Sequence, residues 1–504
     1  MNKNIEADVL IIGGGVAGAA IARELSKYKI DTLLIEKSAD VSMGISKTAH
    51  GYLYTGSEMV YSKILKSRGK KGGPNFDDSH SKSLIESFPI AHDLLHQLDV
   101  PHQHAGSVII TKTEKEFPLL EEIGKHAKEM HAFDKDAVRM IDQKTLREIE
   151  PNITPDAIGA LYDPECILDM FPQEFVFALV DNAKENGVKM QMETEALGFS
   201  QENGTQVVKT NKGYIKTKFI INATGLSADS VADLAGARDD WEFTFTRHQI
   251  ALYDKRLNGL VKNHIRTIPQ GGLLNLVSPM HEGNLCSSCG PKDVIKDRWD
   301  LSTSKKSFDL MVYGANELVP SLSEKDIIAT FVGNTVSNSR DAHIVEPSKK
   351  NPNFINVVLR MPGFTPSPLV AAWVVDLLGE QGLKLEEKTH FNPTRKGIPK
   401  FAELSNEEKD KLIEEDPRYG HVICRCETVT EGEIIEAIKR GATTVQGIQF
   451  RTRAAMGRCQ SGFCGPKLIK ILSDELGIPA TEVTKKGGDS RILLYRSKEL
   501  LKEA

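Results

Sequence analysis

Four of the seven cysteines lie close together in the last part of the chain. Cys424 and Cys426 are separated by one residue, and Cys459 and Cys464, which follow 32 residues later, are separated by four. Four thiolates at this spacing suit a [2Fe-2S] cluster, which takes two sulfur ligands on each iron. Structural zinc is the alternative, but zinc sites usually place two to four residues inside each cysteine pair. The tight first pair therefore favours an iron–sulfur cluster.

Three glycines near the amino end have the spacing of a nucleotide-binding turn. Gly13, Gly15 and Gly18 follow an apolar run and open a segment whose apolar residues recur at helical spacing. Glycines there allow a tight turn, the approach of backbone amides to a pyrophosphate, and close packing of a helix on a strand. Glu36, at the end of the next apolar run, can accept hydrogen bonds from a ribose, and Lys37 lies beside it. The pattern predicts a dinucleotide site on one βαβ unit.

Two later segments favour FAD over NAD. Residues 220–225 form an apolar run that ends in Ala-Thr-Gly, and they resemble the second dinucleotide contact of FAD oxidoreductases. Residues 362–368 precede an apolar helical segment and resemble the flavin loop of the same enzymes, in which a helix amino end faces the flavin ring. The residues of these segments expected to bind FAD are Ala223, Gly225, Gly363, Phe364 and Thr365.

The segment 44–56 resembles the part of these enzymes that runs along the FAD and enters the active site. Ser46 and Thr48 are expected to donate hydrogen bonds to the pyrophosphate. His50 and Tyr54 follow in the same segment and are expected near the reacting end of the flavin.

Nearly the whole chain resembles known families. Residues 7 to about 380 resemble the FAD-dependent oxidoreductases of the D-amino acid oxidase and glycerol-3-phosphate dehydrogenase type. The segment from 421 resembles the bacterioferritin-associated-ferredoxin-like [2Fe-2S] domain, and the combination resembles the large-subunit family of anaerobic glycerol-3-phosphate dehydrogenases. The resemblance implies an α/β fold with a Rossmann-type FAD-binding domain, a mixed α+β substrate domain and a small α-rich [2Fe-2S] domain.

The same resemblance implies the function. The expected enzyme is an FAD-dependent dehydrogenase that takes a hydride from a small polar anionic substrate, of the glycerol-3-phosphate or 2-hydroxyacid type. Electrons are then expected to pass through the [2Fe-2S] cluster to an electron-acceptor protein or to other subunits of an oxidoreductase complex.

Two substrate-reading positions depart from the family pattern. Tyr54 stands where dehydrogenases of hydroxy substrates usually have a histidine base, and Thr335 stands where an arginine usually binds the substrate anion. The substrate is therefore open. One alternative is an amino- or imino-acid dehydrogenase on the same scaffold, because a neutral amine needs no strong base. The other is an electron-transfer subunit with a degenerate substrate site.

Nearby side chains can replace the two missing groups. The candidate bases are His50, His248 and His343, and the candidate anion-binding groups are Lys47, Arg247 and Arg340. From these we select His50 and Arg340, together with Tyr54, as the catalytic residues. Tyr54 is expected to orient the substrate rather than to deprotonate it.

The other cysteines and the arginines near the cluster are less specific. Cys286 and Cys289 form a CxxC pair without the βαβ context of a thioredoxin-like motif, so two buried thiols are expected. Cys166 is expected to be a small core residue. Four arginines flank the cluster cysteines and either stabilise the cluster, face a partner protein or lie in solvent: Arg425, Arg451, Arg453 and Arg458.

Composition sets the broad class. The chain has 504 residues, of which 40% are apolar, and this is too apolar for a disordered protein. The net charge is −5, which argues against a nucleic-acid binder. The longest low-charge stretch, 9–22, is too short to span a bilayer, so no direct membrane span is expected. This stretch also lacks the basic flank and the small-residue cleavage site of a signal peptide, so a cytoplasmic protein is expected, and the clustered cysteines indicate reduced thiols.

These sites require a set of elements and domains. Strands are expected at 7–12, 31–36 and 354–359, two strands within 207–223, helices at 16–28, 307–318 and 368–378, and mostly helix at 78–150. The oxidoreductase core is expected at 1–385, with FAD-binding parts at about 1–77, 151–228 and 335–385 and substrate-domain parts at about 78–150 and 229–334. A linker is expected at 386–420, the [2Fe-2S] domain at 421–484 and a tail at 485–504.

Overall fold

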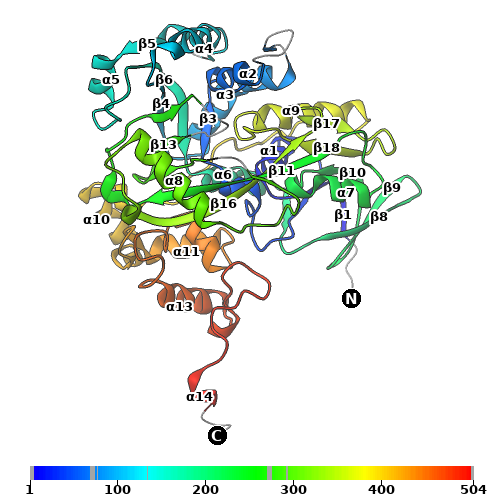
Figure 1. Ribbon diagram of the computed structural model, residues 1–504. Coiled ribbons are helices and arrows are strands. Elements are labelled where there is room, and N and C mark those ends of the chain that lie inside the picture. The colour runs from blue at the N-terminus through cyan, green and yellow to red at the C-terminus, as the bar shows by residue number, and fades with distance from the viewer. Residues whose placement is uncertain are drawn as a thin grey trace.

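The computed structural model describes residues 5–67, 74–76, 78–132, 134–268, 275–290 and 293–500, with the backbone alone at 58, 66, 499 and 500. Two large sheets form the main body, and a small helical domain at the carboxyl end packs below them in the view of Figure 1. None of the described helices combines the length and the apolar character that a bilayer span requires.

The first sheet carries the expected βαβ unit. β1 (Ile5–Ile12) lies parallel to β10 (Gly213–Asn222) on one side and to β2 (Thr32–Ile35) on the other. α1 (Val16–Leu25) connects β1 to β2 and packs against α6 (Pro172–Glu185) and α9 (Ser367–Glu380). Helices cover the strands, which is why their sequences are nearly continuous apolar runs. The other strands of this sheet are β7 (Lys189–Gln191), β8 (Ala196–Glu202), β9 (Thr205–Thr210), β17 (Ile344–Pro347) and β18 (Phe354–Val358).

The second sheet is longer and mostly antiparallel. Its longest strands are β6 (Gly159–Met170), β11 (Phe243–Tyr253) and β16 (Ile327–Asn338). Its shorter strands are β3 (Tyr52–Tyr54), β4 (His102–Thr111), β5 (Arg139–Asp142), β12 (His264–Thr267), β13 (Leu276–Pro279), β14 (Leu285–Ser287) and β15 (Asp293–Ile295). The helices of this half and of the connection between the sheets are α2 (Ser57–Ser67), α3 (Ser79–Gln97), α4 (Phe117–Glu129), α5 (Gln143–Ile149), α7 (Ala228–Leu234) and α8 (Lys305–Leu318).

The chain moves between the two sheets more often than the sequence indicates. Helices α3, α4 and α5 occupy much of 78–150 as expected, but β4 and β5 also run through this range. β3 and β6 lie in the second sheet, although the sequence assigns 1–77 and 151–228 to the FAD-binding part. Strand pairing between distant segments decides these placements, and local periodicity does not show it.

The carboxy-terminal domain is built on four short helices and one two-stranded ribbon. These elements are β19 (Val422–Cys424), β20 (Val429–Thr430), α10 (Asn406–Glu415), α11 (Glu431–Lys439), α12 (Val445–Thr452) and α13 (Gly465–Leu476), and α14 (Ser497–Leu500) follows in the tail. Its small core includes Ile434, Ile448 and Leu468, all fully buried.

The expected linker is ordered and lies on the first half of the molecule. The Lys29 N–H donates to the Glu386 carbonyl over 2.7 Å, and the Arg395 N–H donates to the Gln97 carbonyl over 3.0 Å. α10 then forms within the same range, with a capping box at its start. The segment 386–420 therefore fixes the small domain to the body rather than separating the two.

Candidate functional site

A cavity of about 1190 Å³ is lined by residues of both large sheets. Its volume exceeds the roughly 300–1,000 Å³ of small-molecule sites and leaves room for a dinucleotide with a small substrate. The expected FAD-binding residues that line it are Gly13, Gly15, Glu36, Lys37, Ser46, Thr48, Ala223, Gly225, Gly363 and Phe364.

The glycine turn after β1 has space only for glycine. Gly13 has a φ of +108°, and a Cβ there would lie 2.5 Å from the carbonyl oxygen of Ala223. Gly18 does not line the cavity; a Cβ on it would lie 2.0 Å from the carbonyl oxygen of Gly13. Gly15 is the N-cap of α1, and Gly15, Val16 and Ala17 all line the cavity, so the amino end of the helix faces it. This arrangement fits a pyrophosphate.

Glu36 is held at the cavity wall by backbone donors. Its Oε2 accepts a hydrogen bond from the Gly14 N–H, and its Oε1 accepts one from the Ser38 N–H, both over 2.8 Å. A carboxylate has about four acceptor positions, so Glu36 retains acceptors for a ribose. Lys37 lies 4.3 Å above the centre of the Trp299 ring, and both residues line the cavity. The residues at this end fit an adenosine half.

Two hydroxyl groups of the 44–56 segment are already engaged within the protein. The Ser46 Oγ accepts from the Val16 N–H at 3.0 Å, and the Thr48 hydroxyl donates to the Ile45 carbonyl at 3.0 Å. Both residues still line the cavity.

Thr365 contributes indirectly. It is fully buried behind the cavity wall, and its Oγ1 accepts a hydrogen bond from the Tyr54 N–H at 3.0 Å. This contact ties the loop before α9 to β3, and so fixes Tyr54 relative to Gly363 and Phe364.

Two histidines face the cavity beside Tyr54. The His50 ring stacks on Tyr52 with centroids 5.5 Å apart and on His248 with centroids 6.1 Å apart. His50, Tyr54 and His248 all line the cavity. The third candidate base, His343, does not: its Nε2 lies 2.9 Å from His80 Nδ1, and its Nδ1 accepts from a backbone N–H.

Arg340 is not at the site, which corrects its selection as a catalytic residue. Its guanidinium pairs with Asp240 and Glu346 outside the cavity wall, because the turn after β16 points it to the surface. Lys47 and Arg247 do not line the cavity either, and Arg247 pairs with Asp293 and Asp300. Spacing along the chain cannot show these pairings.

Two arginines that the sequence reasoning missed line the cavity instead. Arg266, on β12, is 4% exposed, and its guanidinium lies 4.0 Å from the centre of the Tyr61 ring. Arg360 follows β18 and donates from Nε to Asp341 Oδ1 at 2.8 Å. The sequence feature that indicates Arg266 as a site residue is its charge close to a run of apolar strand residues. Thr335, where the family usually has arginine, is buried in the cavity wall and contacts Thr246 Oγ1 at 2.8 Å.

The four cluster cysteines form two thiol pairs. The thiols of Cys426 and Cys459, both exposed, lie close enough to shift each other's pKa. Cys424 and Cys464 are both buried, and burial together with the neighbouring Cys424 raises the pKa of the Cys464 thiol. The Phe463 backbone N–H donates to the Cys459 sulfur and is the main reason why the pKa of that thiol lies below its ordinary value. Two pairs in this arrangement suit two irons with two thiolates each.

Most of the arginines around the cluster bind other parts of the same chain. Arg451 pairs with Asp40, and Arg453 pairs with Glu427 and Glu282. Arg458 Nε lies 2.5 Å from Asp254 Oδ2. Only Arg425 among the four is placed against the exposed Phe463 ring, at 4.4 Å. Three of the expected cluster or partner arginines therefore form an interface between domains.

Cys286 and Cys289 are buried, as expected. Burial raises the pKa of each thiol to about 12, so neither is a reactive thiolate at neutral pH. Cys286 Sγ lies 3.6 Å from the Tyr52 hydroxyl, and Cys166 is 1% exposed in the core.

Comparison with known proteins identifies two families in the chain. The family of FAD dependent oxidoreductases matches residues 8–377, and the BFD-like [2Fe-2S] binding domain matches residues 422–474. These matches confirm the expected fold class and both expected cofactors, FAD and a [2Fe-2S] cluster.

Individual relatives cover most of the chain. A glycerol 3-phosphate dehydrogenase of Caloramator mitchellensis is 35% identical over 96% of this chain and 98% of its own. One subunit of the anaerobic glycerol-3-phosphate dehydrogenase of Haemophilus influenzae is 22% identical over 96% of this chain and 88% of its own. The FAD-bound, dithionite-reduced L-alpha-glycerophosphate oxidase of Mycoplasma pneumoniae superposes with a TM-score of 0.69 at 25% identity, covering 78% of this chain and 99% of that one.

Proposed function

We propose, from the premise that the chain belongs to the FAD dependent oxidoreductase family, that this FAD-dependent dehydrogenase oxidises glycerol 3-phosphate to the corresponding ketone. When bound, FAD supplies the hydride acceptor and the [2Fe-2S] cluster supplies a one-electron carrier. The chain itself must bind the substrate anion, take the hydroxyl proton and exclude water.

The observation that carries the choice of substrate is Arg266 in the wall of the cavity. A buried guanidinium supported by the Tyr61 ring is suited to bind a phosphate or carboxylate with two parallel hydrogen bonds. Arg266 lies on β12, two residues after His264, and its cavity also contains His50 and Tyr54. The glycerol 3-phosphate enzymes among the relatives support phosphate as the anion.

His50 is the proposed base for the substrate hydroxyl. Its ring lies nearly parallel to the rings of Tyr52 and His248, and these aromatic contacts orient it. An imidazole nitrogen takes the proton of the hydroxyl, and the carbon that bears this hydroxyl loses its hydrogen as hydride, for which FAD would be the acceptor, so that a C=O bond forms. Tyr54 orients the substrate, and its own position is fixed by Thr365.

Anaerobic mixing of the enzyme with a substrate panel tests this proposal. Glycerol 3-phosphate is expected to bleach the flavin absorbance, whereas L-proline, glycine and L-2-hydroxyglutarate are not. Bleaching by an amino or imino acid alone would establish the alternative, an amino- or imino-acid dehydrogenase. In that enzyme Arg266 would bind the carboxylate of the substrate. If no substrate bleaches a flavin that dithionite reduces, the chain is an electron-transfer subunit with a degenerate site.

The second part of the proposal is that the cluster relays electrons to a protein partner. Cys424, Cys426, Cys459 and Cys464 hold the cluster, and the exposed pair Cys426 and Cys459 lies on its outer side. Next to this pair Phe463 is 45% exposed, and the Lys467 ammonium lies 5.2 Å from the centre of the Phe463 ring. An exposed aromatic ring with two cations, Arg425 and Lys467, suits an acidic acceptor protein or an acidic partner in a complex.

Salt dependence tests this docking surface. Anaerobic reduction of an acidic one-electron acceptor such as rubredoxin is expected to slow as salt rises and to slow again in Phe463→Ala. Tyr313→Ala, which truncates an exposed aromatic residue on α8, is the matched control and is expected to have no effect. Equal rates for Phe463→Ala and the control would exclude this surface.

We place the reaction in the cytoplasm, because all seven cysteines lie in the described part of the chain and none of them forms a disulfide.

A further inference from the structure

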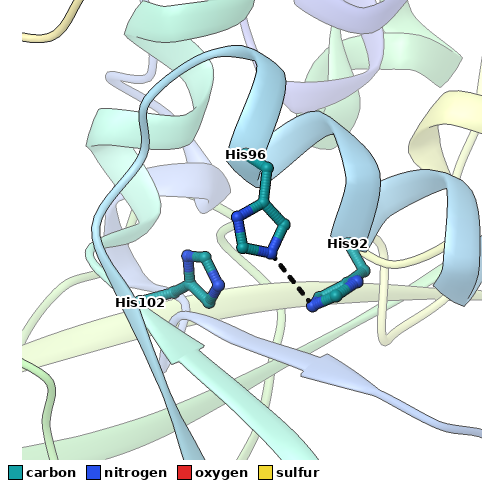
Figure 2. A group of neighbouring side chains, drawn as sticks. All are labelled: His92, His96 and His102. Carbon is teal, nitrogen blue, oxygen red and sulfur yellow. Dashed lines mark hydrogen bonds between the residues drawn. The ribbon is translucent and has the colours of Figure 1, made fainter.

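We propose that His92, His96 and His102 bind a divalent transition-metal ion of the zinc class. One ring nitrogen from each lies within 4.8 Å of the others. Figure 2 shows the three rings gathered around a common space at the end of a helix and the start of a strand. None of the three lines the FAD cavity, and the cluster cysteines lie in another domain.

The helix provides two of the ligands in a favourable spacing. His92 and His96 stand four residues apart near the end of α3, so both project from one face. Their Nε2 atoms are 3.3 Å apart. Two nitrogens at about 2.0–2.1 Å from a tetrahedral zinc ion are themselves roughly 3.3–3.4 Å apart. The separation of these two nitrogens therefore already matches that of two zinc ligands, and the ion would replace the hydrogen bond between them.

The third ligand has its tautomer fixed by the backbone. His102 opens β4, and its Nδ1 lies 2.8 Å from the Val100 carbonyl oxygen. A carbonyl can only accept, so Nδ1 carries the hydrogen and Nε2 presents its lone pair. A second ring nitrogen bound to a backbone carbonyl is the usual arrangement in metal-binding histidines.

The donor set defines the class of metal and leaves one position open. Three imidazoles suit zinc, copper or nickel, whereas magnesium and calcium prefer oxygen ligands. His104 lies two residues after His102 on β4, is exposed, and has its ring centroid 6.3 Å from that of His92. His104 or water completes the tetrahedron.

The site would join two elements at a turn that also binds the linker. The turn between α3 and β4 accepts the Arg395 N–H at the Gln97 carbonyl, and Asp99 Oδ2 accepts the Gly397 N–H at 2.8 Å. Metal binding at this turn is therefore expected to stabilise the contact between the turn and the segment 386–420, which leads to the cluster domain.

Metal analysis of the holoenzyme, with FAD and an assembled cluster, tests the site. After incubation with zinc chloride and gel filtration, the wild type is expected to retain one zinc per chain while its iron content stays constant. Loss of a partner behind a ligand already weakens metal sites by about 10- to 100-fold, so His96→Ala is expected to weaken zinc binding at least that much. His96 is exposed, so this change is compatible with folding.

The control is His126→Ala, which removes a half-buried histidine of another helix, one that pairs with Glu129 on α4. It is expected to bind zinc as the wild type does. In parallel, zinc is expected to raise the unfolding temperature of the wild type and of His126→Ala but not of His96→Ala. No zinc retained by the wild type, or equal zinc affinity in His96→Ala and the wild type, would overturn the proposal.

Discussion

Arg451 of the cluster domain and Asp40 of the FAD-binding domain form a buried ion pair. The Nη2 to Oδ1 distance is 2.9 Å, and the two side chains are 6% and 7% exposed. The guanidinium also lies 3.9 Å from the centre of the Phe177 ring on α6. Phe450, one residue earlier, belongs to the apolar core of the first domain. The two domains therefore share a packed interface.

Breaking this pair is expected to destabilise the whole molecule. Arg451→Met leaves the Asp40 carboxylate buried without its partner, which typically costs about 3–5 kcal/mol. Adding Asp40→Asn is expected to recover part of the loss, because the uncompensated charge is removed. Thermal unfolding measures both effects. Lys470→Met, which removes an exposed pair with Asp474, is the control and is expected to change stability by less than about 1 kcal/mol.

The cluster can be removed without removing the flavin. Cys459→Ser takes away one of the four ligands, so iron is expected to fall from about two per chain to near zero, with FAD still bound. Serine is close in size to cysteine, and residue 459 is exposed, so the domain interface is conserved. Iron, sulfide and flavin analysis measures the result. A variant that retained two irons would show that Cys459 is not a ligand.

Arg266 and Arg247 differ in what they contact, and their substitutions are expected to differ as well. Arg266→Ala removes a charged donor from the cavity, and loss of such hydrogen bonds costs about 1.5–3 kcal/mol, or roughly ten- to a hundred-fold in KM for glycerol 3-phosphate. Arg247→Ala breaks pairs with Asp293 and Asp300 outside the cavity and is expected to leave KM unchanged. Equal effects on KM would place the anion site elsewhere.

The stability of the protein is expected to fall in mild acid through His343. Burial, together with the Arg360 charge, lowers the pKa of His343 from 6.5 to about 4. The Arg360 N–H donates to Nδ1, so this nitrogen cannot be protonated without breaking the bond. The unfolded chain binds this proton below pH 6.5 and the folded chain only near pH 4, so roughly 3 kcal/mol is lost as pH falls through that interval.

Unfolding temperature measured against pH checks this effect. His343→Gln is expected to reduce the slope between pH 6.5 and about 4, and part of the slope remains because burial also lowers the pKa of the neighbouring His80, to about 2. His126→Gln, on α4, is the control and is expected to follow the wild type. A wild-type slope retained in His343→Gln would assign the acid sensitivity to other groups.

Features that depend on neighbours in the sequence can be predicted from it. The turn at Gly13 and Gly15 and the cysteine pairs are of this kind, because each motif does its chemistry with adjacent backbone or a short loop. The positions of Arg266 and Arg340 depend instead on contacts with residues far away in the sequence. The pairing of β12 with β4 and β13 places Arg266 in the cavity wall, and ion pairs with Asp240 and Glu346 hold Arg340 outside the cavity.

The domain interface shows the same limit. A charged segment at 386–420 is typical of a solvated linker, and the arginines after it are typical of a partner surface. Three of those arginines form ion pairs with Asp40, Glu282 and Asp254. Each of these acids lies more than 150 residues away in the sequence from the arginine that it binds. Charge patterns indicate that a residue needs a partner, and only the fold shows which partner it has.

Electron transfer from substrate to the cluster is tested most directly by spectroscopy of one anaerobic reaction. Enzyme mixed with glycerol 3-phosphate is frozen and measured by EPR, with flavin absorbance recorded on the same sample. In the wild type, the flavin absorbance is expected to disappear and the EPR signal of a reduced [2Fe-2S] cluster is expected to appear. In Cys459→Ser, the flavin absorbance is expected to disappear without that EPR signal. Full flavin reduction by glycerol 3-phosphate in the wild type, with the cluster still oxidised at excess substrate, would contradict this account.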